Sequence, residues 1–465
     1  MIKLFGQYLS VRRVVFILGE GLLIFSAITL AMYVFLREET DLRFMLDENW
    51  WKILIMTVVT QISLYFNDLY EIQIGGNRVE LADRLVQAIG LASVILAIIY
   101  ILWPGAMIGR WVFFLGIVVL VLFVVSWRLL YSYVVLKRFF SEKTLLLGDG
   151  DLAKGLHQEI RRRGDIGYDV CCVLGQEGGG YDADHFEGVP VKHGFECLRD
   201  VAAAEGVSNI IVALDQKRGV MPYNDLLACK MKGIAVIDGE SFYERITGKL
   251  LVEKILPSWL VFSDGFKKSA TARLVKRTTD LLFSLLISML LAPLFAVVAV
   301  AIKLESKGRV FFKQERVGEY GKTYMVYKFR SMIEGAEAAS GPIWAKEDDP
   351  RITRVGRVIR RLRIDELPQL WNVIKGDMSF VGPRPERPFF VEALKRKVPY
   401  YNERFTVKPG ITGWAQVMYG YGATEEDALE KLKYDLYYIK NMSLMLDLAV
   451  IFHTVKIVLL ARGSR

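Results

Sequence analysis

The chain is organised around one stretch, Arg360-Arg-Leu-Arg-Ile-Asp-Glu-Leu-Pro-Gln-Leu-Trp-Asn-Val-Ile-Lys-Gly-Asp-Met-Ser-Phe-Val-Gly-Pro-Arg-Pro385. Two adjacent carboxylates, Asp365 and Glu366, lie at its centre. Pro368 is tolerated only in a first helical turn and Gly376 is a natural helix end, so the carboxylates are predicted at a helix N-terminus. The helix dipole there would keep Asp365 ionised and would suit an incoming phosphate. The doublet therefore fits a nucleophile plus a metal ligand for phosphoryl chemistry, although an ordinary capped helix would show the same doublet.

Length and composition indicate a membrane protein of several parts. A chain of 465 residues exceeds one typical domain, and 53% hydrophobic residues with a mean hydropathy of +0.29 indicate membrane segments. The net charge of +9 favours anionic lipid, whereas nucleic-acid binding is disfavoured because no recognition motif accompanies the charge. The four cysteines form no CxxC pair and the four histidines show no ligand pattern, so reduced thiols are expected and no metal site is assigned to these residues.

Four apolar runs predict a bundle of four transmembrane helices in residues 1–141: Val14–Leu36, Ile53–Phe66, Leu85–Trp103 and Trp111–Leu136. The loop after the first run is acidic, whereas basic residues precede the first run and follow the fourth. Both ends of the bundle are therefore expected to face the cytoplasm. Glu20 and Arg128 lie inside runs, either as groups of a transport pathway or, as we favour, as structural partners.

The pattern changes at residue 142, where strand-like and helical stretches begin to alternate. The strands are predicted at Thr144–Leu147, Tyr168–Leu174, Ile210–Leu214 and Ile234–Ile237, which favours a doubly wound, Rossmann-like α/β domain over residues 142–245. Gly148-Asp-Gly-Asp-Leu-Ala153 matches the GxGxxA loop of dinucleotide-binding domains. The acidic residue that normally follows the second strand is missing, since Gly175 and Gln176 occupy its place. Tight packing of the loop is therefore favoured over binding of NAD or another nucleotide.

A fifth apolar run, Leu281–Ile302, has basic residues at both ends. Its length would allow a spanning helix, but the charges favour both ends on the cytoplasmic side. Pro293 lies in mid-run and permits a sharp kink. A re-entrant helix over about residues 276–303 satisfies both observations. The last apolar segment, Ser443–Leu460, carries charged residues and is predicted to be an interfacial or core-packing helix.

Basic residues accumulate before the carboxylate pair, at Arg351, Arg354, Arg357, Arg360, Arg361 and Arg363. A solvated helix face accounts for this pattern as well as attraction of lipid headgroups or substrate phosphates does. The sequence leaves these two interpretations open.

Five sequence words occur in a fixed order: Lys328-Phe-Arg-Ser-Met332, Asp365-Glu-Leu-Pro-Gln-Leu370, Gly376-Asp-Met-Ser379, Val381-Gly-Pro-Arg-Pro385 and Lys408-Pro-Gly-Ile-Thr-Gly-Trp-Ala-Gln-Val417. In this order they resemble the bacterial sugar transferases, which are monotopic polyprenyl-phosphate phosphoglycosyl transferases that start exopolysaccharide and O-antigen assembly. The resemblance extends from about Lys276 to the C-terminus. The N-terminal half resembles the extra module of the long-form members. The resemblance implies a connector at 246–272 and an α/β transferase domain at 273–465, whose re-entrant helix commonly breaks at Ser-Pro, where this chain has Ala292-Pro293.

The resemblance also implies a mechanism and partners. Asp365 would attack a UDP-sugar, release UMP and form an aspartyl phosphosugar, from which undecaprenyl phosphate would take the sugar phosphate. Glu366, with Asp365, would bind Mg²⁺, for which Mn²⁺ could substitute. Arg384 is the first candidate for substrate binding, followed by Lys328, Arg330 and Arg316. The protein would be a multi-pass protein of the bacterial inner membrane with both α/β domains on the cytoplasmic side, and a homodimer is compatible with the long form.

Two other functions remain as alternatives. A membrane nucleotide-sugar dehydratase, which shares the N-terminal module, needs a Tyr-x-x-x-Lys pair in its cofactor domain, but Tyr223 is followed four residues later by Leu227. Tyr324 and Lys328 have this spacing but lie in the transferase-like half. A non-catalytic membrane scaffold would leave the transferase words without a purpose. The sequence leaves the transferred sugar open, and it leaves Arg316 and Asp377 open to structural roles and Trp414 and Gln416 open to packing or nucleotide contact.

Overall fold

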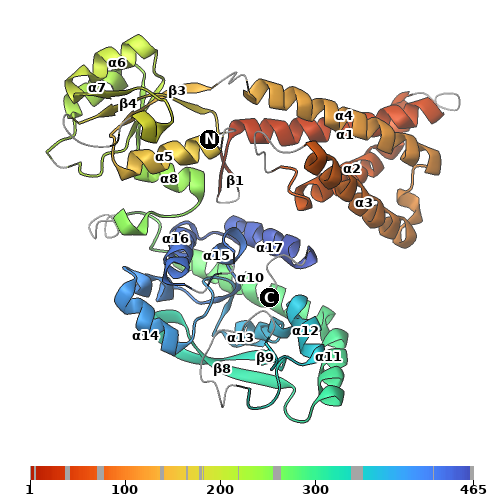
Figure 1. The fold of residues 1–465 in the computed structure, drawn as a ribbon. Coiled ribbons are helices and arrows are strands. Elements are labelled where there is room, and N and C mark those ends of the chain that lie inside the picture. Colours follow the sequence, from red (N-terminus) through yellow and green to blue (C-terminus); the bar gives the residue numbers. More distant parts are fainter. Residues whose placement is uncertain are drawn as a thin grey trace. The chain divides into compact units, whose positions relative to one another are not determined.

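We describe the chain from a computed structural model, which covers residues 2–4, 7–36, 42–70, 78–136, 141–163, 166–176, 181, 183–217, 219–254, 263–336, 349–420, 422 and 424–460 (Figure 1). The chain divides into two compact units, one mainly over Tyr8–Phe242 and the other mainly over Tyr243–Arg465. The short strands β1 (Ile2–Leu4) and β2 (Gln7–Leu9) form a two-stranded sheet at the start of the chain. Part of the predicted connector, residues 255–262, lies outside the described residues.

Four helices occupy the positions of the four N-terminal apolar runs. They are α1 (Val11–Leu36), α2 (Leu42–Phe66), α3 (Arg78–Leu102) and α4 (Arg110–Leu136), with a 3-10 turn at Pro104–Ala106. By length and composition α1, α3 and α4 could cross a membrane. Asn49, Lys52 and Gln61 make α2 more polar, so the fourth transmembrane helix of the predicted bundle stays a prediction.

The two charged residues inside the apolar runs form an ion pair. Arg128 Nη2 lies 2.7 Å from Glu20 Oε1, and both side chains are buried. Arg128 Nη1 also donates a hydrogen bond to the Leu69 carbonyl at 2.6 Å, and its guanidinium lies 5.3 Å from the centre of the Phe16 ring. Each charge thus has a partner on another helix or on the chain that follows one, which supports the structural interpretation of both residues.

A five-stranded parallel sheet forms the predicted α/β domain, with the strand order β5-β4-β3-β6-β7. Leu145, Leu174 and Ile210 are buried on one face, against α6 and α7, and Figure 1 shows α5 and α8 on the other. The doubly wound prediction is confirmed, and the short strand β5 was missed. The elements are β3 (Glu142–Leu147), α5 (Asp151–Arg162), β4 (Tyr168–Gly175), β5 (Val191–His193), α6 (Leu198–Glu205), β6 (Asn209–Val212), α7 (Tyr223–Met231), β7 (Ala235–Asp238) and α8 (Gly239–Thr247), with 3-10 turns at Ala183–Phe186 and Phe195–Cys197.

The second unit contains two strand pairs with helices packed around an aromatic core that includes Trp414, Tyr437 and Tyr438. Strands β8 (Phe311–Val317) and β9 (Thr323–Phe329) are antiparallel, whereas β10 (Ser379–Val381) and β11 (Gly410–Thr412) are parallel. The helices are α10 (Ala270–Leu290), α11 (Ala292–Glu305), α12 (Arg354–Arg361), α13 (Gln369–Lys375), α14 (Pro388–Lys397), α15 (Trp414–Met418), α16 (Glu425–Asn441) and α17 (Leu444–Leu459), and 3-10 turns cover Val252–Lys254, Glu319–Gly321, Ile364–Glu366 and Tyr401–Thr406.

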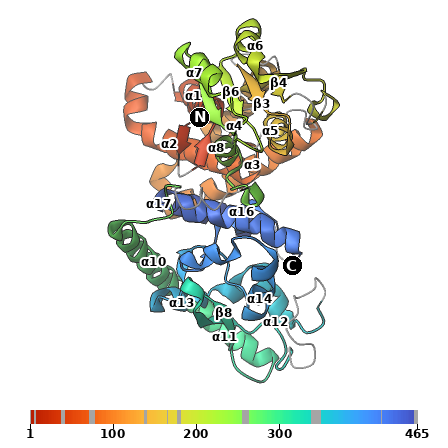
Figure 2. The ribbon, with the colours of Figure 1, turned by 90° about the vertical axis from the view of Figure 1, so that its left-hand side faces the viewer.

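The fifth apolar run consists of two helices, α10 and α11, that meet at a bend of 61° (Figure 2). Pro293 lies in the first turn of α11, where the N–H that proline lacks has no partner within the helix in any case. The hydrogen bonds from Leu291 N to Ile287 O and from Phe295 N to Leu291 O are both 2.9 Å long, so the backbone ladder continues on each side of the bend. The predicted kink is confirmed, whereas the re-entrant path through a membrane stays a prediction.

The final helix α17 combines a packed face with an apolar exposed one. Asp447, Val450 and Lys456 are buried, whereas Leu448 and Phe452 are more than one-third exposed. The core-packing part of the prediction for residues 443–460 is therefore confirmed, and contact with a membrane surface stays a prediction.

Replacing Glu20 by glutamine should destabilise the first unit by about 3–5 kcal/mol, because Arg128 would remain buried without its counter-charge. Thermal unfolding of the detergent-solubilised protein measures this effect. Glu80→Gln is the matched control, since Glu80 pairs with Arg84 at 2.5 Å on an exposed helix surface, where a pair contributes about 0.5 kcal/mol or less. Equal losses in the two variants would contradict the structural importance of the Glu20–Arg128 pair.

Candidate active site

The segment that holds the two adjacent carboxylates is a 3-10 turn followed by a short helix. Arg363 has a left-handed conformation, with φ 55°, and precedes the turn Ile364–Glu366. Pro368 then leads into α13, and Gly376 ends this helix with φ 100°. The predicted helix end at Gly376 is confirmed, whereas the helix begins later than predicted, at Gln369. The carboxylates lie one turn before the α-helix, because the conformation of Arg363 starts a separate 3-10 turn.

Glu366 is bound by two cations, one from a strand of the antiparallel pair and one from the chain that follows a strand of the parallel pair. Its Oε1 atom accepts hydrogen bonds from Lys328 Nζ in β9 at 2.6 Å and from Arg384 Nη2, shortly after β10, at 2.9 Å. Burial by itself would raise the pKa of Glu366, but Arg384 and Lys328 outweigh it and hold the pKa well below its ordinary value. Glu366 is therefore a carboxylate at any physiological pH.

Asp365 has a different electrostatic environment, although it is the adjacent residue. Burial raises its pKa to about 6, and the Glu366 anion adds to the rise, against the opposing charges of Lys328 and Arg360. The sequence predicted an ionised Asp365 because of a helix dipole. In the structure Asp365 is still mostly ionised at neutral pH, but its raised pKa makes it a more basic carboxylate than an ordinary aspartate.

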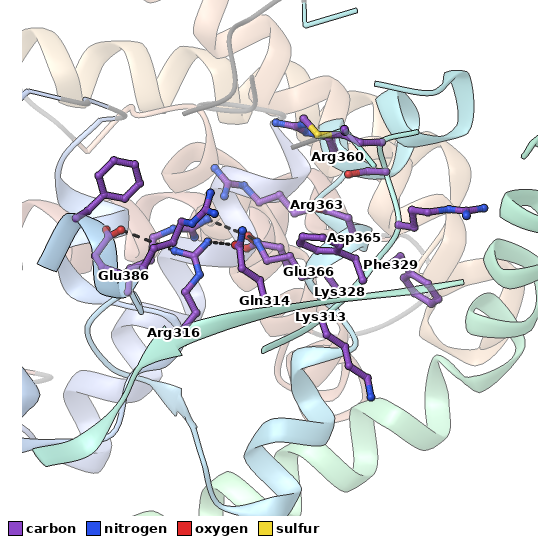
Figure 3. Close-up of a pocket in the computed structure, with 18 of the residues that line it drawn as sticks. Lys313, Gln314, Arg316, Lys328, Phe329, Arg360, Arg363, Asp365, Glu366 and Glu386 are labelled. Atoms are coloured by element: carbon purple, nitrogen blue, oxygen red, sulfur yellow. Dashed lines mark hydrogen bonds and ion pairs between the residues drawn. The ribbon is translucent and has the colours of Figure 1, made fainter. Parts of the chain in front are cut away.

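The carboxylate pair lines a cavity of about 1060 Å³ (Figure 3). Among the described residues, twelve basic side chains and six acidic side chains line this cavity. The basic ones are Arg309, Lys313, Arg316, Lys328, Arg330, Arg351, Arg360, Arg363, Arg384, Arg387, Arg404 and Lys431. An excess of positive charge in a concave site attracts polyanionic ligands such as diphosphates.

Arg330 and Arg316, which the sequence predicted as substrate-binding, line the cavity but also make contacts within the protein. Arg330 Nη1 donates to the Lys307 carbonyl at 2.8 Å, and Arg330 Nη2 donates to the Ser306 carbonyl at 2.9 Å. Arg316 donates to Gln314 Oε1 at 2.6 Å and to the Pro385 carbonyl at 3.1 Å. These contacts support structural roles, and a direct contact of either residue with substrate stays a prediction.

The basic stretch before the carboxylate pair divides into two groups. Arg354, Arg357 and Arg361 are exposed on α12, as a solvated face or a lipid-facing surface requires. Arg351, Arg360 and Arg363 instead line the cavity. The two interpretations that the sequence left open stay open for the three exposed residues, whereas the three at the cavity are placed where substrate phosphates could be attracted.

Two functional candidates escaped the sequence analysis, namely Arg404 and Asp435. Arg404 Nη2 lies 2.8 Å from Asp435 Oδ2 and donates a hydrogen bond to the Arg384 carbonyl at 3.0 Å. The pair is buried and supports the backbone of the residue that contacts Glu366. No motif marks either residue, since each occurs singly in a stretch with ordinary helical or turn composition.

Other residues that the sequence singled out have structural contacts. Trp414 is buried and its Nε1 donates to the Gly248 carbonyl at 2.8 Å, so packing accounts for it. Asp377 pairs with Lys375 at 3.1 Å. Tyr324 and Lys328 lie four residues apart on strand β9, about 13 Å along an extended chain, and Lys328 contacts Glu366. They do not form the adjacent pair that a dehydratase requires.

The donor set fits a magnesium ion bound together with substrate. Among the described residues, no group of three or more His, Cys, Asp or Glu side chains could hold a metal by itself. Mg²⁺ is commonly bound by one or two carboxylates and completes its ligands with water and phosphate oxygens. Asp365 and Glu366 could supply the two carboxylates.

Comparisons with known proteins agree with these observations. A family model described as bacterial sugar transferase matches residues 271–461, and one described as CoA-binding domain matches residues 65–219. The chain is 33% identical over 323 residues, 67% of each chain, to a UDP-glucose:undecaprenyl-phosphate glucose-1-phosphate transferase of Escherichia coli. It is 30% identical over 344 residues, 70% of each chain, to an undecaprenyl-phosphate galactose phosphotransferase of Salmonella typhimurium.

A third relative is a UDP-N-acetylgalactosamine-undecaprenyl-phosphate N-acetylgalactosaminephosphotransferase of Aeromonas hydrophila. It is 43% identical over 240 residues, which are 52% of this chain and 56% of the relative, so the alignment spans little more than half of that protein. With its carboxylate pair at a basic cavity and its apolar helices, the chain has the features of a membrane-associated sugar transferase. The chain belongs to the bacterial sugar transferase family.

Replacing Asp365 by asparagine should stabilise the metal-free protein at about pH 8. The pKa of Asp365 in the folded state, about 6, lies above its ordinary value of 3.8, so ionisation opposes folding. This penalty is absent below about pH 4, grows up to about pH 6 and is complete above it. The expected gain is on the order of 1–3 kcal/mol, measured by thermal unfolding in the presence of EDTA.

Glu366→Gln serves as the matched control and should shift stability in the opposite direction. The depressed pKa of Glu366 means that its ionised form contributes stability above its unfolded pKa. At about pH 4 the wild-type protein and Asp365→Asn should have the same unfolding temperature, because the penalty is absent there. An Asp365→Asn protein that is no more stable than wild type at about pH 8 would contradict the raised pKa.

Proposed function

We propose that the protein transfers a sugar 1-phosphate from a UDP-sugar to undecaprenyl phosphate and releases UMP. The observation that carries this proposal is the carboxylate pair at the basic cavity. One member, Glu366, is bound by Lys328 and Arg384, and the other, Asp365, combines a raised pKa with a position on the cavity wall. A basic carboxylate beside a phosphate-binding surface is suited to covalent phosphoryl transfer.

In the first half-reaction an oxygen of Asp365 attacks the phosphorus that carries the sugar. The bond from this phosphorus to the oxygen that bridges to the UMP phosphate breaks, and UMP leaves with that oxygen. The product is an aspartyl phosphosugar. Arg384 and Lys328 lie within hydrogen-bond distance of the adjacent carboxylate, so they can offset negative charge as the two anions approach. Mg²⁺ or Mn²⁺, bound by Glu366 and Asp365, would supply further charge neutralisation at the diphosphate.

In the second half-reaction a phosphate oxygen of undecaprenyl phosphate attacks the same phosphorus. The bond between Asp365 and phosphorus breaks, the carboxylate is restored, and a lipid-linked diphosphate sugar is formed. Two displacements split one difficult reaction between two anions into two steps. The complete transfer would be the first membrane step of exopolysaccharide or O-antigen synthesis.

The acceptor lipid determines where this chemistry takes place. Its phosphate lies at headgroup level, while the nucleotide donor is water-soluble. The bent pair α10 and α11 would enter and leave a bilayer on one side, which supports a cytoplasmic site at the inner membrane of a bacterium. The apolar helices α1, α3 and α4 would anchor the same chain.

The transferred sugar is left open by this proposal. The three relatives are named for N-acetylgalactosamine, glucose and galactose, and their names share undecaprenyl phosphate. The chain is therefore tested with a panel of UDP-sugars that covers these three and N-acetylglucosamine.

UMP release from this panel, with undecaprenyl phosphate and Mg²⁺, is the test of the proposed function. One donor should give UMP, and Asp365→Asn should lower its rate by at least about a thousandfold, because the attacking group is removed. Chelation with EDTA should abolish release, and added Mg²⁺ should restore it.

Glu392→Gln is the control substitution, since Glu392 is an exposed residue of α14 whose partner is Lys395. It should leave the rate unchanged. Release of UDP in place of UMP would mean direct glycosyl transfer and would refute the aspartyl intermediate. The absence of nucleotide release from every donor, with a folded protein, would refute the proposed function.

A further inference from the structure

The N-terminal half of α10 contacts the C-terminal end of α13, the helix that follows the carboxylate pair. Arg277 Nη1 donates to the Val373 carbonyl at 2.6 Å, and Arg277 Nη2 donates to the Ile374 carbonyl at 2.9 Å. These carbonyls belong to the last turn of α13, where backbone acceptors lack partners within the helix and a positive charge is favourable. Arg277 therefore fixes the end of α13 that lies opposite Asp365 and Glu366.

One turn further along the same helix, Asp280 holds a second element of the site. Its Oδ2 accepts a hydrogen bond from Ser379 Oγ at 2.7 Å, and its Oδ1 accepts one from Phe380 N at 3.1 Å. Asp280 and Ser379 are both buried. Ser379 and Phe380 belong to strand β10, which continues directly into the Gly-Pro-Arg sequence that ends at Arg384. Asp280 therefore fixes the strand that delivers Arg384.

The surroundings of Asp280 show that this arrangement is costly. Lys276 Nζ lies 2.8 Å from Asp447 Oδ2 and 3.5 Å from Asp280 Oδ1, so one lysine is shared by two buried carboxylates. Tyr438 donates its hydroxyl to Asp447 at 2.6 Å. Buried charge networks contribute little net stability compared with apolar packing, but they define geometry well. This network is suited to fixing the position of α10 relative to β10.

We propose that Arg277 and Asp280 are positioning residues, which set the place of the Asp365–Glu366 pair relative to Arg384 through α13 and β10. This inference rests on the proposed function. The two residues are three positions apart and lie on one face of α10, so a shift of this helix moves both elements together. The same helix continues into the apolar bend with α11. The geometry of the active site is thereby tied to the helix that would enter the bilayer.

Arg277→Gln and Asp280→Asn should lower kcat for UMP release by about 10- to 100-fold, because a displacement of about 1 Å is enough for such a loss. KM for the UDP-sugar should stay within about threefold of wild type, since the cavity residues are unchanged. Arg277→Lys should recover part of the loss, because it keeps the charge but lacks the two-pronged donor. Arg273→Gln is the control, since Arg273 is an exposed residue one turn earlier on α10.

A kcat of Arg277→Gln equal to that of Arg273→Gln, with both proteins folded, would overturn the inference. A stability cycle tests it without the reaction, so that failure of the proposed function can be distinguished. If Arg277 holds Glu366 within reach of Lys328 and Arg384, the loss of stability caused by Glu366→Gln should fall to about half or less in the Arg277→Gln background. An unchanged loss would also overturn the inference, whether or not UMP is released.

A second and independent observation concerns the glycine loop of the α/β domain. Ligands of doubly wound sheets bind where the strand order reverses, here between the loops that follow β3 and β6. Asp215, in the loop after β6, accepts hydrogen bonds from Asp151 N at 3.0 Å and from Leu152 N at 3.3 Å. These two amides open α5, the place at which a dinucleotide pyrophosphate is normally bound.

The two glycines of the loop are needed for this internal contact. A Cβ atom at Gly150 would lie 2.0 Å from Asp215 Oδ2, and one at Gly148 would lie 2.5 Å from the Ala213 carbonyl. The glycine pattern is thus accounted for by close approach of the loop after β6. We infer that Asp215 occupies the anion site of this domain as an internal carboxylate and excludes nucleotide phosphates from it.

Thermal shift with inorganic pyrophosphate, NAD⁺ and coenzyme A tests this second inference on the full chain. The unfolding temperature of wild type should rise only by the amount that ligand binding in its basic catalytic cavity produces. Asp200→Ala, which removes an exposed acid of the same domain, should show the same rise. Asp215→Ala should show an additional shift with pyrophosphate. A folded Asp215→Ala protein that behaves as Asp200→Ala does, with no additional shift with pyrophosphate, would overturn the inference.

Discussion

Glu366 Oε1 receives one hydrogen bond from Lys328 and one from Arg384, and the rest of the site depends on this contact. Two adjacent carboxylates in a poorly solvated turn repel each other, and burial disfavours the charged form of both. Lys328 and Arg384 both contact Glu366, so they stabilise the charge of Glu366 more than that of Asp365. Glu366 is held as an anion, and Asp365 retains a pKa of about 6. One sequence doublet thus yields two carboxylates with different chemical properties.

The cations are brought to Glu366 by elements that are far apart in the sequence. Lys328 comes from the antiparallel pair β8 and β9, whereas Arg384 follows the parallel pair β10 and β11. Arg404 supports the Arg384 backbone, and the N-terminal half of α10 supports β10 and α13. These contacts connect several elements of the second unit to the positions of Glu366 and Arg384. Such networks are costly to bury, which is expected where position matters more than stability.

Carboxylates also contact cationic or N–H partners in the first unit, although we place no catalytic residue there. In its helices, Glu20 and Arg128 neutralise each other within apolar surroundings. In its α/β domain, Asp215 satisfies the amides that begin α5. A carboxylate at a helix N-terminus stabilises the helix and satisfies donors that would otherwise need water or a ligand. In our inference the chain supplies the anion itself, and the similarity of this region to a CoA-binding domain model concerns the fold.

The sequence by itself determined the local features of this protein. Apolar runs located α1 to α4, the alternation of strand-like and helical stretches located four of the five strands of the parallel sheet, and Pro368 and Gly376 bounded α13, because these signals act over a few neighbouring residues. The carboxylate pair and Arg384 were marked by their sequence words, and the break at Pro293 by its ring. Only the tertiary structure decided which cations meet Glu366, that Arg330 and Arg316 make internal contacts, and that Arg404 and Asp435 lie behind Arg384. It alone gave Asp365 its raised pKa, because burial and the charges of distant residues set a pKa, and both arise only when separated segments pack together.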